Sequence, residues 1–91
     1  MYIQAEISYS PFHAGFEEEI TIFLKRLKNY KNLRIEIQPM STLIGGEAAD
    51  VFNLLEREVL KTFEENQAVF TIRISNACPD KCDINPAAGN Q

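Results

Sequence analysis

Alternating hydrophobic and polar residues predict four β-strands in this chain. The alternating segments are residues 3–10, 33–38, 41–45 and 68–75. In the first of them, Ile3, Ala5, Ile7 and Tyr9 fall on one face and polar side chains on the other. A period of two residues is typical of a strand with one buried and one exposed face. Pro11 is expected to end this strand.

Hydrophobic residues at three- and four-residue steps predict two amphipathic helices. The first begins near Phe16, with acidic residues in its first turn and basic residues at its end, which complements the helix dipole. Its apolar stripe is Phe16, Ile20, Phe23, Leu24 and Leu27. The second runs from about Glu47 to Glu65, and its expected stripe is Ala48, Val51, Phe52, Leu55, Val59 and Phe63.

The order β-α-β-β-α-β predicts an α+β, ferredoxin-like fold. Right-handed crossovers would place both helices on one face of a four-stranded antiparallel sheet. Residues 1–80 are predicted to form this single domain, and residues 81–91, which are small, polar and aperiodic, to form a flexible tail. The strands are expected to contribute to the core through Ile3, Ile7, Ile35, Ile37, Phe70, Ile72 and Ile74.

The opposite face of the predicted sheet is polar and has no helix to cover it. It carries Gln4, Glu6, Ser8, Arg34, Glu36, Gln38, Thr71, Arg73 and Ser75. Three interpretations remain open at this point: a solvated surface, a surface for self-association, or the floor of a binding site.

Composition and charge narrow the classes of function. The 91 residues are 45% hydrophobic and carry a formal net charge of −4. Phosphate backbones require an excess of Lys and Arg, and the central strands lack the aromatic residues on which RNA bases stack, so no nucleic-acid partner is expected. No apolar run reaches the ~18 residues of a membrane span, and the first residues read as a strand and not as a signal peptide. We therefore expect a cytoplasmic protein without membrane insertion.

The cysteines and the single histidine offer little for metal binding or catalysis. Cys78 and Cys82 stand four residues apart and His13 is the only imidazole, whereas a zinc site needs three or four ligands. A nucleophilic cysteine needs a base, and nothing in the sequence places His13 beside Cys78. A reducing compartment also disfavours a disulfide. No metal, no cofactor and no catalytic residue is expected.

Two other segments have side chains suited to a small polar ligand. Glu6 lies in the middle of a strand, where it is either a solvated acid or a carboxylate that accepts a hydrogen bond from an amino group. Met40, Ser41 and Thr42 place a thioether and two hydroxyls just before Gly45-Gly46. The glycine pair is either turn geometry or exposed backbone N–H groups, and it matches no phosphate-binding motif.

Three segments in matching order resemble the YkoF-type thiamine/hydroxymethylpyrimidine-binding family. They are Ala5-Glu6-Ile7-Ser8-Tyr9-Ser10-Pro11, Pro39-Met40-Ser41-Thr42-Leu43-Ile44-Gly45-Gly46 and Ile74-Ser75-Asn76-Ala77-Cys78-Pro79-Asp80. The resemblance covers residues 2–80 and implies a single-domain member that binds thiamine or its hydroxymethylpyrimidine moiety. It further implies a non-catalytic role in vitamin salvage or transport, assembly as a homodimer or homotetramer, and an association with a vitamin transport system.

The residues and the resemblance together give a predicted ligand site. Its members are Glu6, Ser8, Phe12, Met40, Ser41, Thr42, Asn76, Cys78 and Asp80. The alternatives are a small cofactor-free enzyme, which would use Cys78 or His13, and a regulatory or interaction subunit that uses the sheet face.

Overall fold

The computed structural model describes residues 1–11 and 16–77. The elements follow the order β1 (Tyr2–Pro11), α1 (Phe16–Leu27), β2 (Arg34–Ile37), β3 (Thr42–Glu47), α2 (Ala48–Glu65) and β4 (Ala68–Ser75). The predicted tail, residues 81–91, and the predicted domain end at residue 80 lie outside the described residues.

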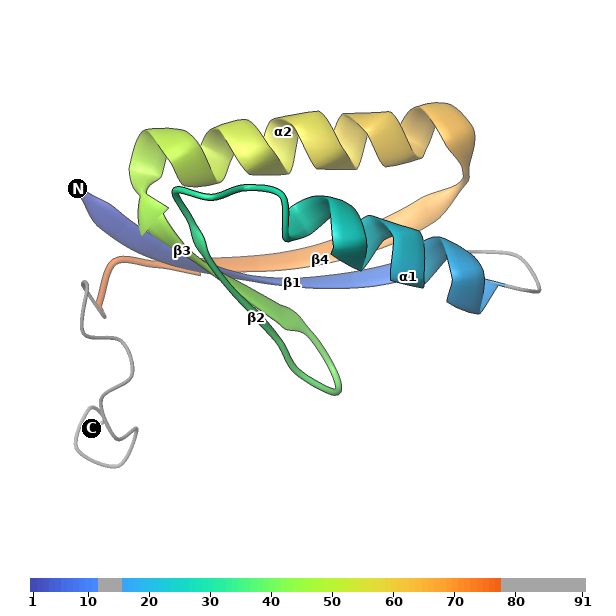
Figure 1. The fold of residues 1–91 in the computed structure, drawn as a ribbon, viewed down its shortest axis with the longest axis horizontal. Coiled ribbons are helices and arrows are strands. Elements are labelled where there is room, and N and C mark those ends of the chain that lie inside the picture. The colour runs from blue at the N-terminus through green and yellow to red at the C-terminus, as the bar shows by residue number, and fades with distance from the viewer. Residues whose placement is uncertain (12–15, 78–91) are drawn as a thin grey trace.

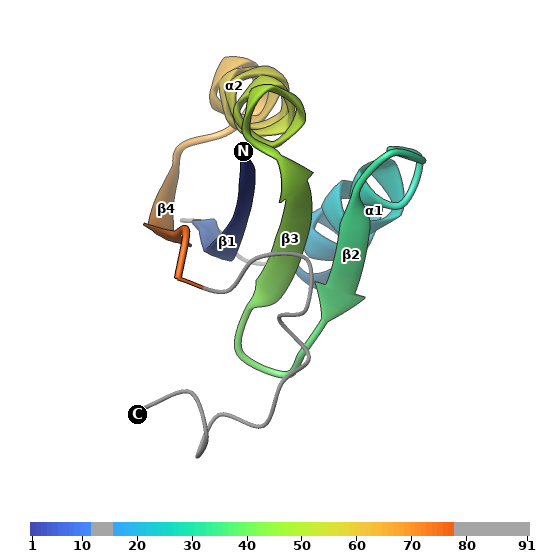
Figure 2. The ribbon, with the colours of Figure 1, turned by 90° about the vertical axis from the view of Figure 1, so that its left-hand side faces the viewer.

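The four strands form one antiparallel sheet in the order β2-β3-β1-β4, with both helices on the same side (Figures 1 and 2). In the register of β1, Glu6 lies between Leu43 of β3 and Arg73 of β4. This confirms the predicted α+β, ferredoxin-like fold. β1 and β3 are the central strands, and β2 and β4 are the edges.

The core lies between the central strands and the two helices. Ile3, Ala5 and Ile7 of β1 and Ile44 of β3 are buried against Phe23 and Leu27 of α1 and Val51, Leu54 and Leu55 of α2. Ile35 and Phe70 are partly buried against this cluster. The prediction that Ile37, Ile72 and Ile74 belong to the core is wrong, since they are 42%, 36% and 45% exposed. They lie on the edge strands, which the helices cover less completely than the centre.

The buried stripe of α2 is rotated relative to the predicted one. Phe52 and Phe63 are 52% and 48% exposed, contrary to the prediction. The residues that are buried are Val51, Leu54, Leu55, Glu58 and Thr62. Two of them are polar, because α2 faces the polar side chains of α1 as well as the sheet.

The glycine pair belongs to β3 and not to a turn. The predicted third strand, residues 41–45, is displaced to Thr42–Glu47, and Gly45 and Gly46 are both buried within it. A Cβ at Gly46 would lie 2.4 Å from Leu33 Cδ2, and one at Gly45 would lie 3.1 Å from the Tyr2 hydroxyl. The glycines therefore allow two large side chains to approach the strand closely.

The N-terminus and the start of α2 hold each other in place. Ala48, the first residue of α2, donates its N–H to the carbonyl oxygen of Met1 at 2.8 Å, and the Met1 amino group lies 2.9 Å from Glu47 Oε1. The Glu47 side chain makes no capping hydrogen bond, so the chain end supplies the acceptor that a helix N-terminus needs.

Candidate functional site

The candidate site lies where β1 separates from the β2–β3 hairpin. The pairing of β1 with β3 ends at Ile7, which lies opposite Thr42, while β1 continues to Pro11 along β4. The tip of the hairpin, residues 38–41, points away from β1 (Figures 1 and 2). At this point residues 38–40 are exposed, and Ser8 and Ser41 are half-buried.

A small cavity occupies this position, and four predicted site residues line it: Ser8, Met40, Ser41 and Thr42. Its volume is ≈ 170 Å³, and apolar side chains of β1 and α1, among them Ile7 and Phe23, complete its wall. Pockets for drug-sized ligands have about 300–1,000 Å³. This cavity can therefore hold a single ring or a similar fragment.

Glu6 lies beside this cavity, on the open face of the sheet. Ser41 Oγ donates a hydrogen bond to Glu6 Oε2 at 2.8 Å, and Arg73 Nη1 lies 3.5 Å from Glu6 Oε1. The side chain of Glu6 is 36% exposed and that of Arg73 is 82% exposed. The ion pair is thus a surface pair that contributes about 0–1 kcal/mol, and a ligand can displace Arg73 at little cost.

The remaining contacts in the hairpin tip hold its backbone. Ser8 Oγ donates to the carbonyl oxygen of Met40 at 3.2 Å, and Gln38 N–H donates to the carbonyl oxygen of Ser41 at 2.8 Å. The Met40 side chain is 88% exposed. The hairpin tip therefore presents a flexible thioether to solvent, beside the cavity.

Thr42 does not share the face of Glu6. It lies opposite Ile7, which points to the helices, and it is only 4% exposed. Adjacent residues of a strand point to opposite faces, so Ser41 and Thr42 contribute to the two sides of the sheet. Thr42 lines the cavity from the core side, and Ser41 connects the cavity to Glu6.

The structure does not bring Asn76 to this site. Ser75 pairs with Gln4, so Asn76 lies toward the start of β1, whereas Ser8 and Ser41 lie beyond Ile7 toward its end. At about 3.3 Å per residue, the separation along the strand is at least ~13 Å. Phe12, Cys78 and Asp80 lie outside the described residues, as does His13.

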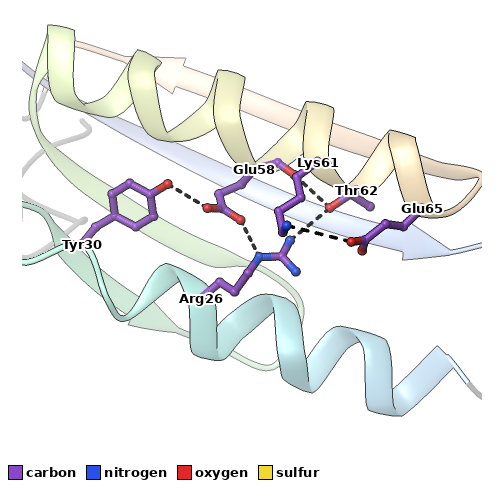
Figure 3. A network of polar contacts seen from close by, with 6 residues as sticks. All are labelled: Arg26, Tyr30, Glu58, Lys61, Thr62 and Glu65. Atoms are coloured by element: carbon purple, nitrogen blue, oxygen red, sulfur yellow. Dashed lines mark hydrogen bonds and ion pairs between the residues drawn. The ribbon is translucent and has the colours of Figure 1, made fainter.

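A buried polar network between the helices was not predicted from the sequence. The carboxylate of Glu58 in α2 accepts a hydrogen bond from Arg26 Nε at Oε1 and one from the Tyr30 hydroxyl at Oε2, both at 2.7 Å (Figure 3). Arg26 Nη2 also donates to Thr62 Oγ1 at 3.4 Å. Its signal in the sequence is weak: Glu58 and Thr62 fall three and seven residues after the buried Leu55, on the same helical face. Their partners depend on how the two helices pack.

Burial raises the pKa of Tyr30 above its ordinary value. The hydrogen bond that the Tyr30 hydroxyl donates to Glu58 raises this pKa further. Arg26 also lies over the ring of Phe23, 5.6 Å from its centroid. The network thus joins α1, the segment after it and α2 through one carboxylate. Its immediate role is to fix the distance between the helices.

A row of aromatic rings extends the core toward the end of β1. Tyr9 stacks on Phe70 with a centroid distance of 4.9 Å, and Phe23 lies 5.0 Å from Tyr9. Burial raises the pKa of the Tyr9 phenol, and the nearby Glu19 acts in the same direction. Tyr9 and Phe23 line a cleft of ≈ 340 Å³ between α1 and the end of α2.

The described residues contain no group of three or more His, Cys, Asp or Glu side chains that could hold a metal ion. Within the same part of the chain, neither helix has the length and apolarity needed to cross a membrane.

Comparison with known proteins gives a likeness in structure alone. No protein-family model and no curated protein sequence matches the chain. Among solved structures, a Thermotoga maritima protein assigned provisionally to thiamine biosynthesis or salvage is 14% identical, with a TM-score of 0.68 over 82% of this chain and 83% of its own. A protein of Methanocaldococcus jannascii is 18% identical, with a TM-score of 0.70 over 82% and 79%.

A domain of unknown function, DUF77, from Bacillus cereus is 14% identical, with a TM-score of 0.65 over 82% of this chain and 75% of its own. At such low identity the likeness shows the fold alone. The role of the cavity and of Glu6 has to be argued from their own geometry.

Proposed function

We propose that this protein binds thiamine, or its hydroxymethylpyrimidine moiety, without catalysing a reaction, and acts in vitamin salvage or transport. The observation that carries the proposal is the hydrogen bond to Glu6 from Ser41, which lines a ring-sized cavity. The similarity in fold to a protein assigned provisionally to thiamine biosynthesis or salvage supports the choice of ligand.

The chemistry of the site suits an aminopyrimidine. An ionised carboxylate accepts hydrogen bonds only, and the Glu6 carboxylate would accept one from the exocyclic amino group. The Ser41 hydroxyl can both donate and accept, so it can turn from Glu6 to a ring nitrogen when the amino group takes its place. The apolar wall of the cavity would then cover the ring, and a ligand without the amino group would leave the carboxylate partly desolvated and unpaired.

The size of the cavity favours the pyrimidine as the buried part. A volume of ≈ 170 Å³ holds one ring, so the thiazolium ring of thiamine would lie outside, near the exposed Met40. The negative net charge of the protein, −4, favours a cationic ligand.

The proposal includes a homodimer or homotetramer in the cytoplasm, and an association with a vitamin transport system. Self-association is supported by exposed apolar side chains, namely Ile72 and Ile74 on the edge strand β4 and Phe52 and Phe63 on α2. An edge strand has unpaired N–H and C=O groups, so β4 of a second copy can extend the sheet and cover these side chains. Light scattering that gives a single-chain mass at micromolar concentration would contradict this part.

Calorimetry on a pair of matched variants tests the binding site. Thiamine, its phosphates and hydroxymethylpyrimidine are first screened by thermal shift, because a ligand at 100 times its Kd stabilises the folded state by ~2.7 kcal/mol. We expect Glu6→Gln to weaken binding by more than about tenfold, or roughly 1.4 kcal/mol. Glu36→Gln is the control. Glu36 lies on the same face of the sheet as Glu6, since both are paired with Leu43 of β3, and it forms an ion pair with Arg34 at 3.4 Å.

Equal affinity of wild type and Glu6→Gln would remove Glu6 from the site. Stabilisation by none of the ligands at millimolar concentration would contradict the function itself. The rival, a small cofactor-free enzyme, depends on His13 or Cys78, and turnover that Cys78→Ala abolishes while ligand affinity persists would establish it.

A further inference from the structure

A second cavity lies on the helix side of the molecule, away from Glu6. Its volume is ≈ 480 Å³, and it is lined by the segment after α1 and by one side of α2. The loop contributes Asn29, Tyr30, Lys31 and Asn32, α2 contributes Asn53, Arg57 and Glu58, and α1 contributes Arg26. Amides and cations therefore dominate its wall.

The charge of this cavity is opposite to that of the protein. Three positive side chains and one carboxylate give it a formal net charge of +2, whereas the whole chain carries −4. The charge of Glu58 is balanced by that of Arg26, whose Nε lies 2.7 Å from Glu58 Oε1, so the charges of Lys31 and Arg57 remain. Lys31 and Arg57 thus determine the field inside the cavity.

Lys31 and Arg57 are the cations of this cavity that remain beside the paired Arg26. Both side chains are exposed, and within residues 1–11 and 16–77 neither forms a hydrogen bond or an ion pair. Arg57 lies near the Tyr30 hydroxyl, since its charge acts on the pKa of that phenol against the effect of Glu58. Asn53 precedes Arg57 by four residues, which places the amide and the guanidinium on the same side of α2, one turn apart.

The end of α1 opposes an anion less than a free helix C-terminus would. The carbonyl oxygens of Leu24, Arg26 and Leu27 accept hydrogen bonds from the N–H groups of Lys28, Asn29 and Tyr30. The negative end of the helix dipole is largely due to unpaired carbonyl groups, so these bonds weaken it.

We propose that this cavity binds the phosphoryl group of a small organic phosphate ester, held by Arg57, Lys31 and the amides of Asn53 and Asn32. A guanidinium offers a planar pair of donors that matches two phosphate oxygens, and Lys adds a point charge. Amide N–H₂ groups supply further donors without adding charge.

The volume indicates an ester and not phosphate alone. At ≈ 480 Å³ the cavity falls within the ~300–1,000 Å³ typical of sites for organic ligands, and Tyr30 provides an aromatic wall for the organic part. This site is separate from the one beside Glu6, and the inference does not depend on the function proposed for that site.

Phenyl phosphate, inorganic phosphate and phenol are the probes, titrated by calorimetry at low ionic strength. We expect phenyl phosphate to bind more tightly than inorganic phosphate and phenol not to bind. Arg57→Gln and Lys31→Gln should each weaken phenyl phosphate by roughly fivefold, equivalent to about 1 kcal/mol at 1.4 kcal/mol per factor of ten. Because the second pKa of a phosphate ester is about 6, affinity should rise as the pH is raised through that value.

Lys61→Gln is the matched control, because Lys61 is an exposed cation on α2, pairs with Glu65 at 4.0 Å and does not line the cavity. Its loss of affinity should be smaller than that of Arg57→Gln, because Lys61 does not line the cavity and its charge is paired with that of Glu65. An equal loss in Lys61→Gln would mean unspecific attraction and overturn the proposal. No saturable binding at millimolar phenyl phosphate, equal affinity for phenol, or equal affinity for inorganic phosphate would also overturn it.

Discussion

Replacing Glu58 by alanine tests whether one buried carboxylate holds the two helices together. The Glu58 side chain is 9% exposed, and the partners it would leave are the Arg26 guanidinium and the Tyr30 hydroxyl, each at 2.7 Å. In Glu58→Ala, Arg26 loses its counter-ion and Tyr30 loses its acceptor. Both groups then remain partly desolvated between α1 and α2.

The magnitude follows from the exposure of the partners. Breaking a fully buried ion pair costs about 3–5 kcal/mol. The Arg26 side chain is 23% exposed, so it can turn partly to water, and the expected loss in the free energy of unfolding is about 2–3 kcal/mol. For a domain of this size, a loss of 1 kcal/mol lowers the Tm by about 4–8 °C, so a decrease of about 8–24 °C is expected.

Urea denaturation followed by circular dichroism measures the change, with Glu56→Ala as the control. Glu56 is exposed on the same helix, two residues before Glu58, and its replacement should change stability by at most about 0.5 kcal/mol. If Glu58→Ala costs no more than Glu56→Ala, the network does not contribute to the packing of the helices and the reasoning is refuted.

Two further predictions concern stability. The pKa of Tyr30 is raised above 10.0 in the folded protein, so the folded state favours the neutral phenol. The resulting stabilisation is present below pH 10 and is lost as the pH rises through the pKa of the folded state. Tyr30→Phe should therefore cost about 1.5 kcal/mol near neutral pH and reduce the loss of stability above pH 10; an unchanged alkaline profile in urea denaturation would contradict this. Gly46→Ala should cost about 1 kcal/mol, because its Cβ would lie 2.4 Å from Leu33 Cδ2 and the end of the Leu33 side chain would have to turn away. Gly45→Ala, with a contact of 3.1 Å to the Tyr2 hydroxyl, should cost less, and the reverse order in the same assay would refute the packing argument.

The elements of the fold could be predicted because they depend on local periodicity. The predicted strand at residues 68–75 and the end of the second helix at Glu65 agree with β4 and α2. Burial at the edges could not be predicted in this way. Ile72 and Ile74 alternate as a core strand would, yet their exposure depends on β4 being an edge strand.

The structure brings together part of the predicted ligand site, whose role in binding stays a prediction. Ser8, Met40, Ser41 and Thr42 line one cavity, but Asn76 lies at the other end of β1 because the antiparallel register of β4 places it there. A single sequence does not give that register. Nor does it give the contact of Arg26 with Glu58, which are 32 residues apart and meet only when the helices pack.

Mapping of backbone amide shifts by NMR during a titration with hydroxymethylpyrimidine tests the central claim most directly. The amides of Ser8, Ser41 and Thr42, together with that of Glu6, should move with a common dissociation constant, and those of residues 29–32 should not. Shifts confined to residues 29–32, or no saturable shift at Glu6 and Ser41, would contradict the binding site proposed here.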